Sequence, residues 1–233
     1  IEEEGLHFFL NIFSKNEVGY KNLLNIISSA YMNHKENAYV DIEQLYKNKE
    51  GLLVLSGGNN SILKYSNGNS ITSQSASFVA DFKKEFIDNF YIEIQRIEGN
   101  DYRIDEEVIL NLAYDNNIPV VATNDVYFEG PDHFEAHDAL MCIEKKLFVS
   151  QKDRKRLSKN HYFKSQNEMQ ELFSDIPEAL FNTIEIAQRC SHRPKIKMPV
   201  LPSYDNDDSQ EKKLLRELSH KGLEQNLTQK FGS

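Results

Sequence analysis

The chain has 233 residues, of which 39% are hydrophobic, and its 14 Phe and 11 Tyr can fill one sizeable core. Its formal net charge of −9 predicts weak or no DNA binding by the chain alone, because Lys and Arg must displace counterions from phosphates. No stretch approaches the roughly 18 apolar residues of a membrane helix, and the start, Ile-Glu-Glu-Glu-Gly, lacks the regions of a signal peptide. We therefore expect a cytoplasmic protein with no membrane partner.

Two local features stand out from this composition. A basic run from Lys152 to Lys159 is either a solvated loop or a contact with phosphate or an acidic partner. Cys142 and Cys190 lie far apart and lack CxxC or Cys/His spacing. We expect both cysteines to be reduced and structural.

The first half of the chain alternates between strand and helix patterns. Residues 6–13 form an apolar run with one alternating face, which predicts a single strand close to the start. Asn16 can cap the helix that follows it. Further strands are predicted at 51–55, 90–95 and 118–123, separated by helical patterns around 78–86 and 108–113.

This alternation predicts an α/β fold in which the four strands lie parallel in one sheet or barrel, because helical crossovers return the chain to the same edge. Chemistry in such folds gathers at the carboxyl ends of the strands. The positions of interest are therefore Ser56 to Asn60, Gln95 to Gly99 and Asn124 to Phe128.

After residue 130 the patterns become helical. Phe134 to Lys146 is amphipathic, Ser165 and Glu168 have the spacing of a capping box, and Pro177 can begin another helix. A proline-containing stretch then leads to a charged helix from about Gln210 to Leu227. We expect one domain over residues 1–195, an extended connector over 196–208, and a helix of the next module over 209–233.

Two side chains are candidate metal ligands. Asp125 follows an apolar strand directly, so its carboxylate can bind a metal, act as a general base, or cap its own loop. His7 lies on the strand face opposite Leu6 and Phe8, where it can be a ligand or a hydrogen-bonded core residue.

The other histidines point to chemistry less strongly. His133 and His137 have the spacing of a zinc-binding pair, but Glu135 is one place off the HExxH pattern and Pro131 places His133 at or before the helix start. The remaining ones are expected at the surface: His34, His161, His192 and His220. No GxSxG motif or close group of Asp residues for two Mg²⁺ ions is present in the sequence.

Several motifs together resemble the alpha subunit of bacterial DNA polymerase III. Asn16-Glu17-Val18-Gly19-Tyr20-Lys21-Asn22-Leu23 resembles the N-x-x-G-Y-x-N-L element of that family. The other three matches follow in the same order: residues 50–58 resemble its E-G-L-I-x-L-S-G turn, residues 119–126 its P-x-V-A-T-N-D-V strand end, and residues 173–187 its F-x-D-x-P-E-A-L-x-N-T-x-x-I-A helix pair.

The resemblance implies part of a distorted (β/α)₇ barrel, the PHP (polymerase and histidinol phosphatase) domain at the amino end of a replicative polymerase. The family's first barrel strands, with an HxH motif, are expected before Ile1. The palm Asp residues that hold the catalytic Mg²⁺ ions of the parent polymerase are expected in later modules. The parent works with DNA, a proofreading exonuclease and other subunits of the polymerase III holoenzyme.

The family's metal-ligand pattern carries over to His7 and Asp125 only. Members with an intact cluster have Cys where this chain has Gly58, and His where it has Tyr127. Those two side chains cannot supply the thiolate or imidazole of a tight transition-metal site. The resemblance therefore implies an inactive, scaffold type of PHP domain, with no catalytic residues, no tightly bound cofactor, and His7 and Asp125 as vestigial ligands.

Two other functions stay open. His7 and Asp125 permit a metal-dependent PHP phosphoesterase or 3′-5′ exonuclease. An unrelated α/β binding domain is the third possibility.

Overall fold

The computed structural model describes residues 2–3, 6–33, 38–58, 63, 73–97, 103–154, 156–196, 198–199 and 208–232. The chain divides into two units, Ile1–Pro194 and Lys195–Ser233, and the second holds one helix, α8 (Asp208–Phe231). None of the described helices combines the length and apolar character that crossing a lipid bilayer requires.

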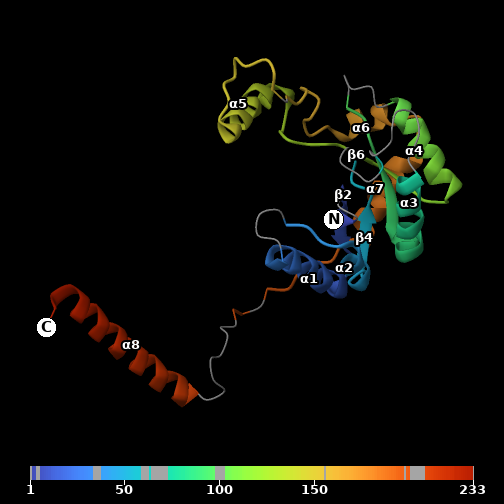
Figure 1. Cartoon of the computed structure of the whole chain (residues 1–233). Coiled ribbons are helices and arrows are strands. Elements are labelled where there is room, and N and C mark those ends of the chain that lie inside the picture. Colours follow the sequence, from blue (N-terminus) through green and yellow to red (C-terminus); the bar gives the residue numbers. More distant parts are fainter. Residues whose placement is uncertain are drawn as a thin grey trace. The chain divides into compact units, whose positions relative to one another are not determined.

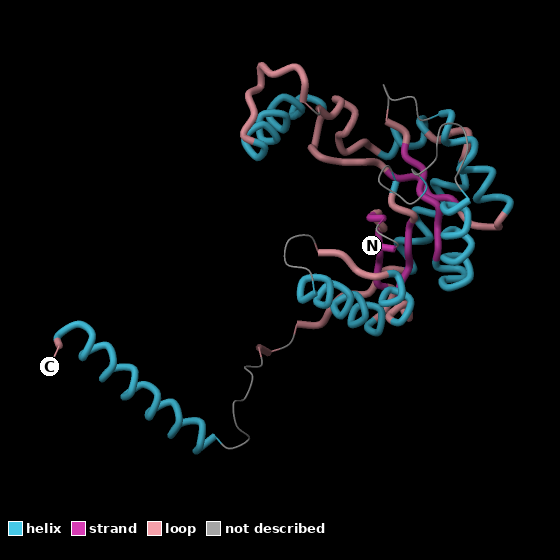
Figure 2. The backbone as a smooth tube through the Cα atoms, viewed as in Figure 1, coloured by secondary structure: helices cyan, strands magenta, loops and turns pink. Residues whose placement is uncertain are grey.

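A four-stranded sheet forms the centre of the first unit. Its order is β3 (Asn11–Ser14), β4 (Leu52–Leu55), β5 (Phe90–Gln95) and β6 (Val120–Thr123), and Figure 2 shows these strands side by side. β5 is parallel to both β4 and β6. The unit is therefore mixed α/β, as the strand and helix patterns predicted, and its sheet is mostly parallel.

Helices connect and cover the strands (Figure 1). Their bounds are α1 (Glu17–Asn33), α2 (Ile42–Lys47), α3 (Ser73–Phe86), η3 (Ile87–Asn89), α4 (Arg103–Asp115), η4 (Pro131–His133), α5 (Phe134–Lys145), α6 (Gln166–Leu172) and α7 (Pro177–Arg189).

The main core lies on one face of the sheet. Phe90 and Ile92 of β5 pack there with the stacked rings of Phe82 and Phe86 from α3. Alternate strand residues enter a smaller cluster on the opposite face, where Tyr91 packs near the carboxyl end of α7. The alternation of β-strand side chains thus divides each strand between two layers.

The direction predicted for the first strand is wrong. β3 runs antiparallel to β4, with Asn11 opposite Leu55 and Ser14 opposite Leu52. Two helices, α1 and α2, lie between these strands in the chain, where the sequence patterns predicted one. The six-residue α2 was not foreseen from the sequence.

The predicted strand over residues 6–13 is also interrupted. β2 (Leu6–His7) pairs antiparallel with β1 (Glu2–Glu3), and residues 8–10 separate it from β3. The break lies where the chain passes the turn after β4: a Cβ on Gly57 would lie 1.9 Å from the carbonyl oxygen of Phe9. The chain here bends around a glycine turn and does not continue as a strand.

Helix starts follow the predicted caps. The Asn16 side chain accepts a hydrogen bond from the Gly19 N–H at 2.9 Å. Ser165 and Glu168 form the capping box, and hydrogen bonds from Ser165 and Tyr162 lower the pKa of Glu168 to about 2. Pro177 begins α7.

Two of the motifs noted in the sequence meet at one point. The Lys15 N–H donates to the Gly51 carbonyl at 2.8 Å, and the Asn22 amide donates to the Glu50 carbonyl at 2.9 Å. A Cβ on Gly19 would lie 2.0 Å from the Gly51 carbonyl oxygen. The residue 16–23 motif therefore holds the amino end of α1 against the turn before β4, and its glycine allows that approach.

Gly19→Ala should destabilise the chain by about 1–3 kcal/mol, because backbone atoms must move to admit the methyl group. Urea unfolding followed by circular dichroism measures this loss. Gly222→Ala in α8 is the control, since a Cβ there has no heavy atom within 4 Å. Equal stability of Gly19→Ala and wild type would contradict the close packing.

Candidate functional site

A buried carboxylate lies near the carboxyl end of the sheet. Glu93 of β5 is 5% exposed and shares a strand face with Tyr91 and Gln95. The Asn11 amide donates to both carboxylate oxygens at 2.9 and 3.2 Å, and the Gly57 N–H donates at 3.1 Å. The Thr123 hydroxyl donates at 2.6 Å and the Gln95 amide at 3.2 Å.

We call these five residues, Asn11, Gly57, Glu93, Gln95 and Thr123, the Glu93 hub. The hydrogen-bond donors come from all four strands or the turns after them. Because β3 is antiparallel, its first residue lies at the same edge as the last residues of the other three. A buried charge is tolerated when hydrogen bonds replace its water, so the hub ties four segments to one point.

The turn after β4 leaves no room for a larger residue. Gly58 has a φ of +52°, and a Cβ there would lie 2.4 Å from the Gln95 side-chain amide. Gln95 also donates to Thr123 at 3.1 Å. The hub therefore fills the space that a metal-binding side chain at position 58 would need.

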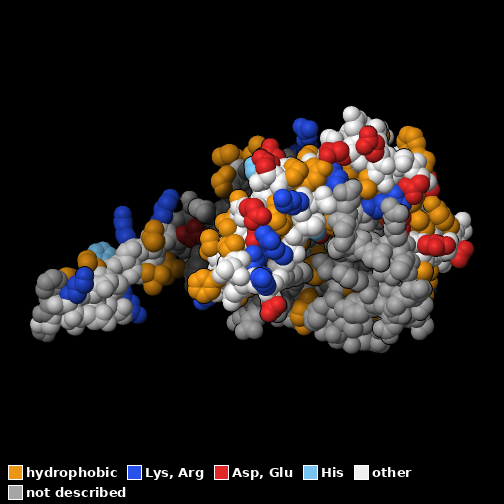
Figure 3. Space-filling view, turned by 90° about the horizontal axis from the view of Figure 1, so that it is seen from above, with side chains coloured by type: hydrophobic (Ala, Val, Ile, Leu, Met, Phe, Trp, Pro, Cys, Tyr) orange, Lys and Arg blue, Asp and Glu red, His pale blue; other side chains and the backbone are white. Residues whose placement is uncertain are grey.

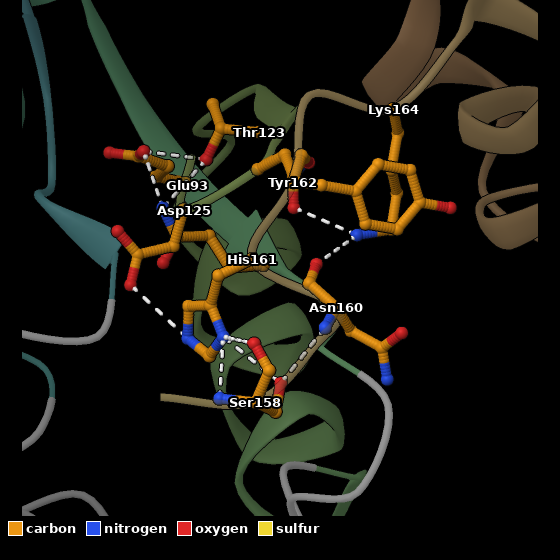
Figure 4. Close-up of polar contacts among 10 residues, drawn as sticks. Glu93, Thr123, Asp125, Ser158, Asn160, His161, Tyr162 and Lys164 are labelled. Carbon is orange, nitrogen blue, oxygen red and sulfur yellow. Dashed lines mark hydrogen bonds and ion pairs between the residues drawn. The ribbon is translucent and has the colours of Figure 1, made fainter. Parts of the chain in front are cut away.

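Asp125 follows β6 and faces His161 (Figure 4). The His161 Nε2 lies 3.8 Å from Asp125 Oδ2, and the ring is 5% exposed. Its Nδ1 lies 3.2 Å from the Ser158 backbone nitrogen and 3.1 Å from the Ser158 carbonyl oxygen, so Ser158 surrounds this side of the ring. The expectation that His161 lies at the surface is wrong.

Ser158, His161 and Asp125 have the residue types of an acyl-transfer triad, and Ser158 Oγ lies 3.0 Å from Nδ1. The same nitrogen also lies within hydrogen-bond distance of the Ser158 N–H and carbonyl, and 3.8 Å between Nε2 and Asp125 is too long for an orienting hydrogen bond. These three residues are better explained as contacts that hold the Asp125 loop in place. The Asn124 side-chain amide adds to them by donating to the Tyr162 carbonyl at 2.7 Å.

Tyr127 lies between two histidine rings. The centroids of His137 and His161 are 5.7 and 5.8 Å from its own, both in edge-on arrangements. Burial, followed by the charge and hydrogen bond of Asp125, raises the pKa of the Tyr127 phenol. His137 also packs on Phe128 at 5.5 Å, whereas His133 lies before α5, in η4. These contacts account for His137 as a packing residue.

The donors at this rim do not suit a multinuclear metal cluster. Gly58 offers no ligand, and Tyr127 offers a phenol whose pKa is raised. Within the described part of the chain, no three His, Cys, Asp or Glu side chains come together as a possible metal site. The His7 backbone lies in β2, but its side chain falls outside the described residues. Of the possible metal ligands near this edge of the sheet, the structure places Asp125 and His161 next to each other.

A second polar centre anchors α5. Asp138 is 2% exposed, and Arg154 forms a two-pronged ion pair with it, with Nη2 2.6 Å from Oδ2. Arg156 Nε lies 3.2 Å from the same carboxylate, and its guanidinium stacks over Phe134. Hydrogen bonds and charge from Arg154, outweighing burial, lower the pKa of Asp138. Asp138 thus holds the following loop against the helix.

Sequence reasoning missed both centres. Glu93 could have been suspected, because it is the one charged residue in the apolar run of β5. Its partners come from strands that only the fold brings together. Asp138 and Arg154 are 16 residues apart, and nothing in their spacing marks them as a pair.

Glu93→Gln should lower the free energy of unfolding by about 1–3 kcal/mol, because the new amide cannot accept all the donors that now face the carboxylate. Thermal and urea unfolding measure the loss. Glu43→Gln, at an 83% exposed side chain, is the matched control and should be neutral. A Glu93→Gln chain as stable as wild type would contradict the role of the hub.

The Asp138 ion pair predicts a pH dependence. Because the folded pKa lies below the ordinary value of 3.8, the carboxylate adds stability above that value, and this is lost as pH falls through the folded pKa. The difference in unfolding free energy between wild type and Asp138→Asn should therefore be largest near neutral pH and shrink below pH 3.8. A difference that stays constant down to pH 2 would contradict this prediction.

Comparison with known proteins agrees with the motifs. Residues 3–97 match the family model described as PHP domain. The chain is 37% identical over 217 residues to the DNA polymerase III subunit alpha of Caulobacter vibrioides, covering 92% of this chain and 19% of that protein. The subunits of the same name from Rickettsia bellii and Pasteurella multocida are 34% and 36% identical, over 99% and 94% of this chain and 20% and 19% of theirs.

The chain thus spans about a fifth of the length of these relatives. The similarity covers nearly all residues of the chain. The matched part includes Gly19 and Gly51, which contact each other, and the loop that carries Asp125. Along nearly all of its length the chain is similar to one stretch of DNA polymerase III alpha subunits, and residues 3–97 of it match the PHP domain.

Proposed function

We propose that this chain is the PHP part of a catalytic alpha subunit of the replicative DNA polymerase III holoenzyme, and that it acts there as a scaffold. In this proposal the parent protein is a DNA-directed DNA polymerase that uses Mg²⁺ and works in the cytoplasm. Its partners are DNA, a proofreading exonuclease and other holoenzyme subunits. The chain itself has no polymerase active site.

The observation that carries the scaffold role is the Glu93 hub. It occupies the carboxyl edge, where α/β folds place their chemistry, with a network of hydrogen bonds between neutral donors and one carboxylate. Gln95 fills the space next to Gly58. Donors of the chain itself thereby hold four segments in place.

The partial (β/α)₇ barrel is also a proposal. Since β3 and β4 are antiparallel, the crossover argument no longer supports it, and its support is the match of residues 3–97 to the PHP domain.

A metal-dependent phosphoesterase or 3′-5′ exonuclease is the second candidate. Asp125 and His161 favour it, because a carboxylate and an imidazole 3.8 Å apart are donor types that bind zinc or manganese. Residual metal binding by His7 and Asp125, as vestigial ligands, would also favour this second candidate. The two candidates differ in metal content and in what the chain can catalyse.

The chain should not extend a primed DNA template with any divalent cation, because nucleotidyl transfer needs a pair of metal ions held by close carboxylates. The full-length subunit, purified in parallel, should extend the same primer. Incorporation by the isolated chain would contradict the scaffold role, and failure of the full-length subunit would contradict the polymerase assignment.

Elemental analysis after dialysis supplies the second readout of this experiment. We expect far less than one zinc or manganese per chain, because losing ligands costs more than the roughly 10- to 100-fold that second-shell changes cost. Gly58→Cys with Tyr127→His restores the family's ligands, and adding Gln95→Ala removes the side chain that blocks position 58. If only the triple variant binds metal, the result supports an ancestral metal site that Gln95 now blocks. Near-stoichiometric metal in the wild-type chain would instead favour the phosphoesterase or exonuclease.

A further inference from the structure

The charge of the chain is unevenly distributed. Residues 145–164 contain eight Lys or Arg and a single acidic residue, Asp153, although the whole chain has 27 basic and 36 acidic residues. We call this stretch the basic island. It begins at the end of α5 and continues through the loop that Arg154 and Arg156 attach to that helix.

The cations of the basic island have two different roles. Arg154, which is buried, and Arg156, whose side chain is 45% exposed, are both engaged with Asp138. In contrast, Lys145, Lys146, Lys152 and Lys159 are exposed, and none of the four forms an ion pair with another described residue. These four lysines are therefore available to an external anion.

An exposed aromatic ring lies within the same stretch. Phe148 is 73% exposed, between Lys146 and Lys152 in the chain. Its N–H donates to the Gln151 side chain at 2.8 Å, and its carbonyl accepts the Gln151 N–H at 3.0 Å. Arg154 also donates to the Val149 carbonyl at 3.2 Å. The ring is thus presented by a closed turn that the buried ion pair anchors.

The face of the molecule around α5 combines both kinds of side chain. Figure 3, seen from above, shows a face on which Lys and Arg lie among hydrophobic side chains and several Asp or Glu. The exposed apolar side chains on the helix and turn are Leu140, Ile143, Leu147, Phe148 and Val149. Such a surface fits a ligand that has anionic and flat apolar parts at once.

We infer that the basic island is a contact surface for single-stranded DNA, with Lys145, Lys146, Lys152 and Lys159 on phosphates and a base stacked on Phe148. The choice of DNA among polyanions rests on the proposed function. Single strands expose base faces, whereas a duplex keeps them stacked, so only the single strand uses the ring and the lysines together. An acidic peptide is the competing ligand, and it would need the apolar area but not the aromatic face.

The charge arithmetic sets the expected strength. The acidic remainder of the chain opposes binding, so we expect a dissociation constant of about 10⁻⁶ to 10⁻⁴ M at 50 mM salt. Four phosphate contacts to a single strand predict a slope of about −3 in a plot of log association constant against log salt concentration, or roughly 60-fold weaker binding at 200 mM.

Fluorescence anisotropy with a labelled 20-nucleotide oligo-dT tests the proposal on the 233-residue chain. Lys145→Gln with Lys146→Gln should reduce the steepness of the salt dependence by about 1.4. Phe148→Leu, which keeps the apolar area but removes the aromatic face, should weaken binding roughly fivefold or more. Lys21→Gln with Lys47→Gln makes the same change in net charge at two exposed lysines elsewhere, and should leave the slope unchanged.

Equal effects of the two lysine pairs would overturn the site, because only net charge would matter. Wild-type affinity in Phe148→Leu, together with displacement of oligo-dT by polyglutamate at equal charge, would indicate an acidic protein ligand instead. If the full-length subunit extends primers but the basic-island variants bind oligo-dT like wild type, this inference fails while the proposed function stands; if the full-length subunit extends nothing, the proposed function itself fails.

Discussion

The structure at the carboxyl edge of the sheet depends on the hydrogen bonds to the buried Glu93 carboxylate. A buried negative charge must recover the hydration that it loses, and here neutral donors from four segments supply it. Each donor that satisfies Glu93 is at the same time fixed in position. The segments that carry Asn11, Gly57 and Thr123 therefore cannot separate without exposing an unsatisfied charge, which makes the edge of the sheet a rigid surface.

The topology of the sheet makes this arrangement possible. With β3 antiparallel, Asn11 at its start lies beside the ends of β4 and β5 and can reach Glu93. The close contact of Gly19 and Gly51 fixes the opposite end of the same strand pair. A parallel first strand would instead have placed Ser14 at the rim, and the hub would have lost the donor that binds both carboxylate oxygens.

Local structure was predictable where one residue decides it. Asn16, Ser165 and Pro177 start helices because each satisfies or removes an unpaired backbone N–H, and the sequence shows them directly. The direction of β3 was not predictable, because α2 has only six residues and its pattern did not stand out between the first helix and β4. The connection between β3 and β4 therefore holds two helices where the patterns predicted one.

The site was predictable only in part, for a related reason. Asp125 could be chosen because it follows an apolar strand, but its partner His161 lies 36 residues later in a polar stretch that gives no sign of burial. Glu93 has the same difficulty, since its partners Asn11 and Thr123 lie 82 and 30 residues away. Contacts of this kind depend on strand order and register, which a single sequence does not display.

We propose that hydrogen bonds, and not metal ions, hold this edge of the sheet together. Crystals of the chain grown with one equivalent of zinc or manganese, with diffraction collected at the metal absorption edge, test it most directly. The maps should show no anomalous peak within bonding distance of Asp125, His161 or Glu93, and Asn11, Gly57 and Thr123 should still donate to the Glu93 carboxylate. A strong anomalous peak bound by Asp125, with the hub opened around it, would contradict it.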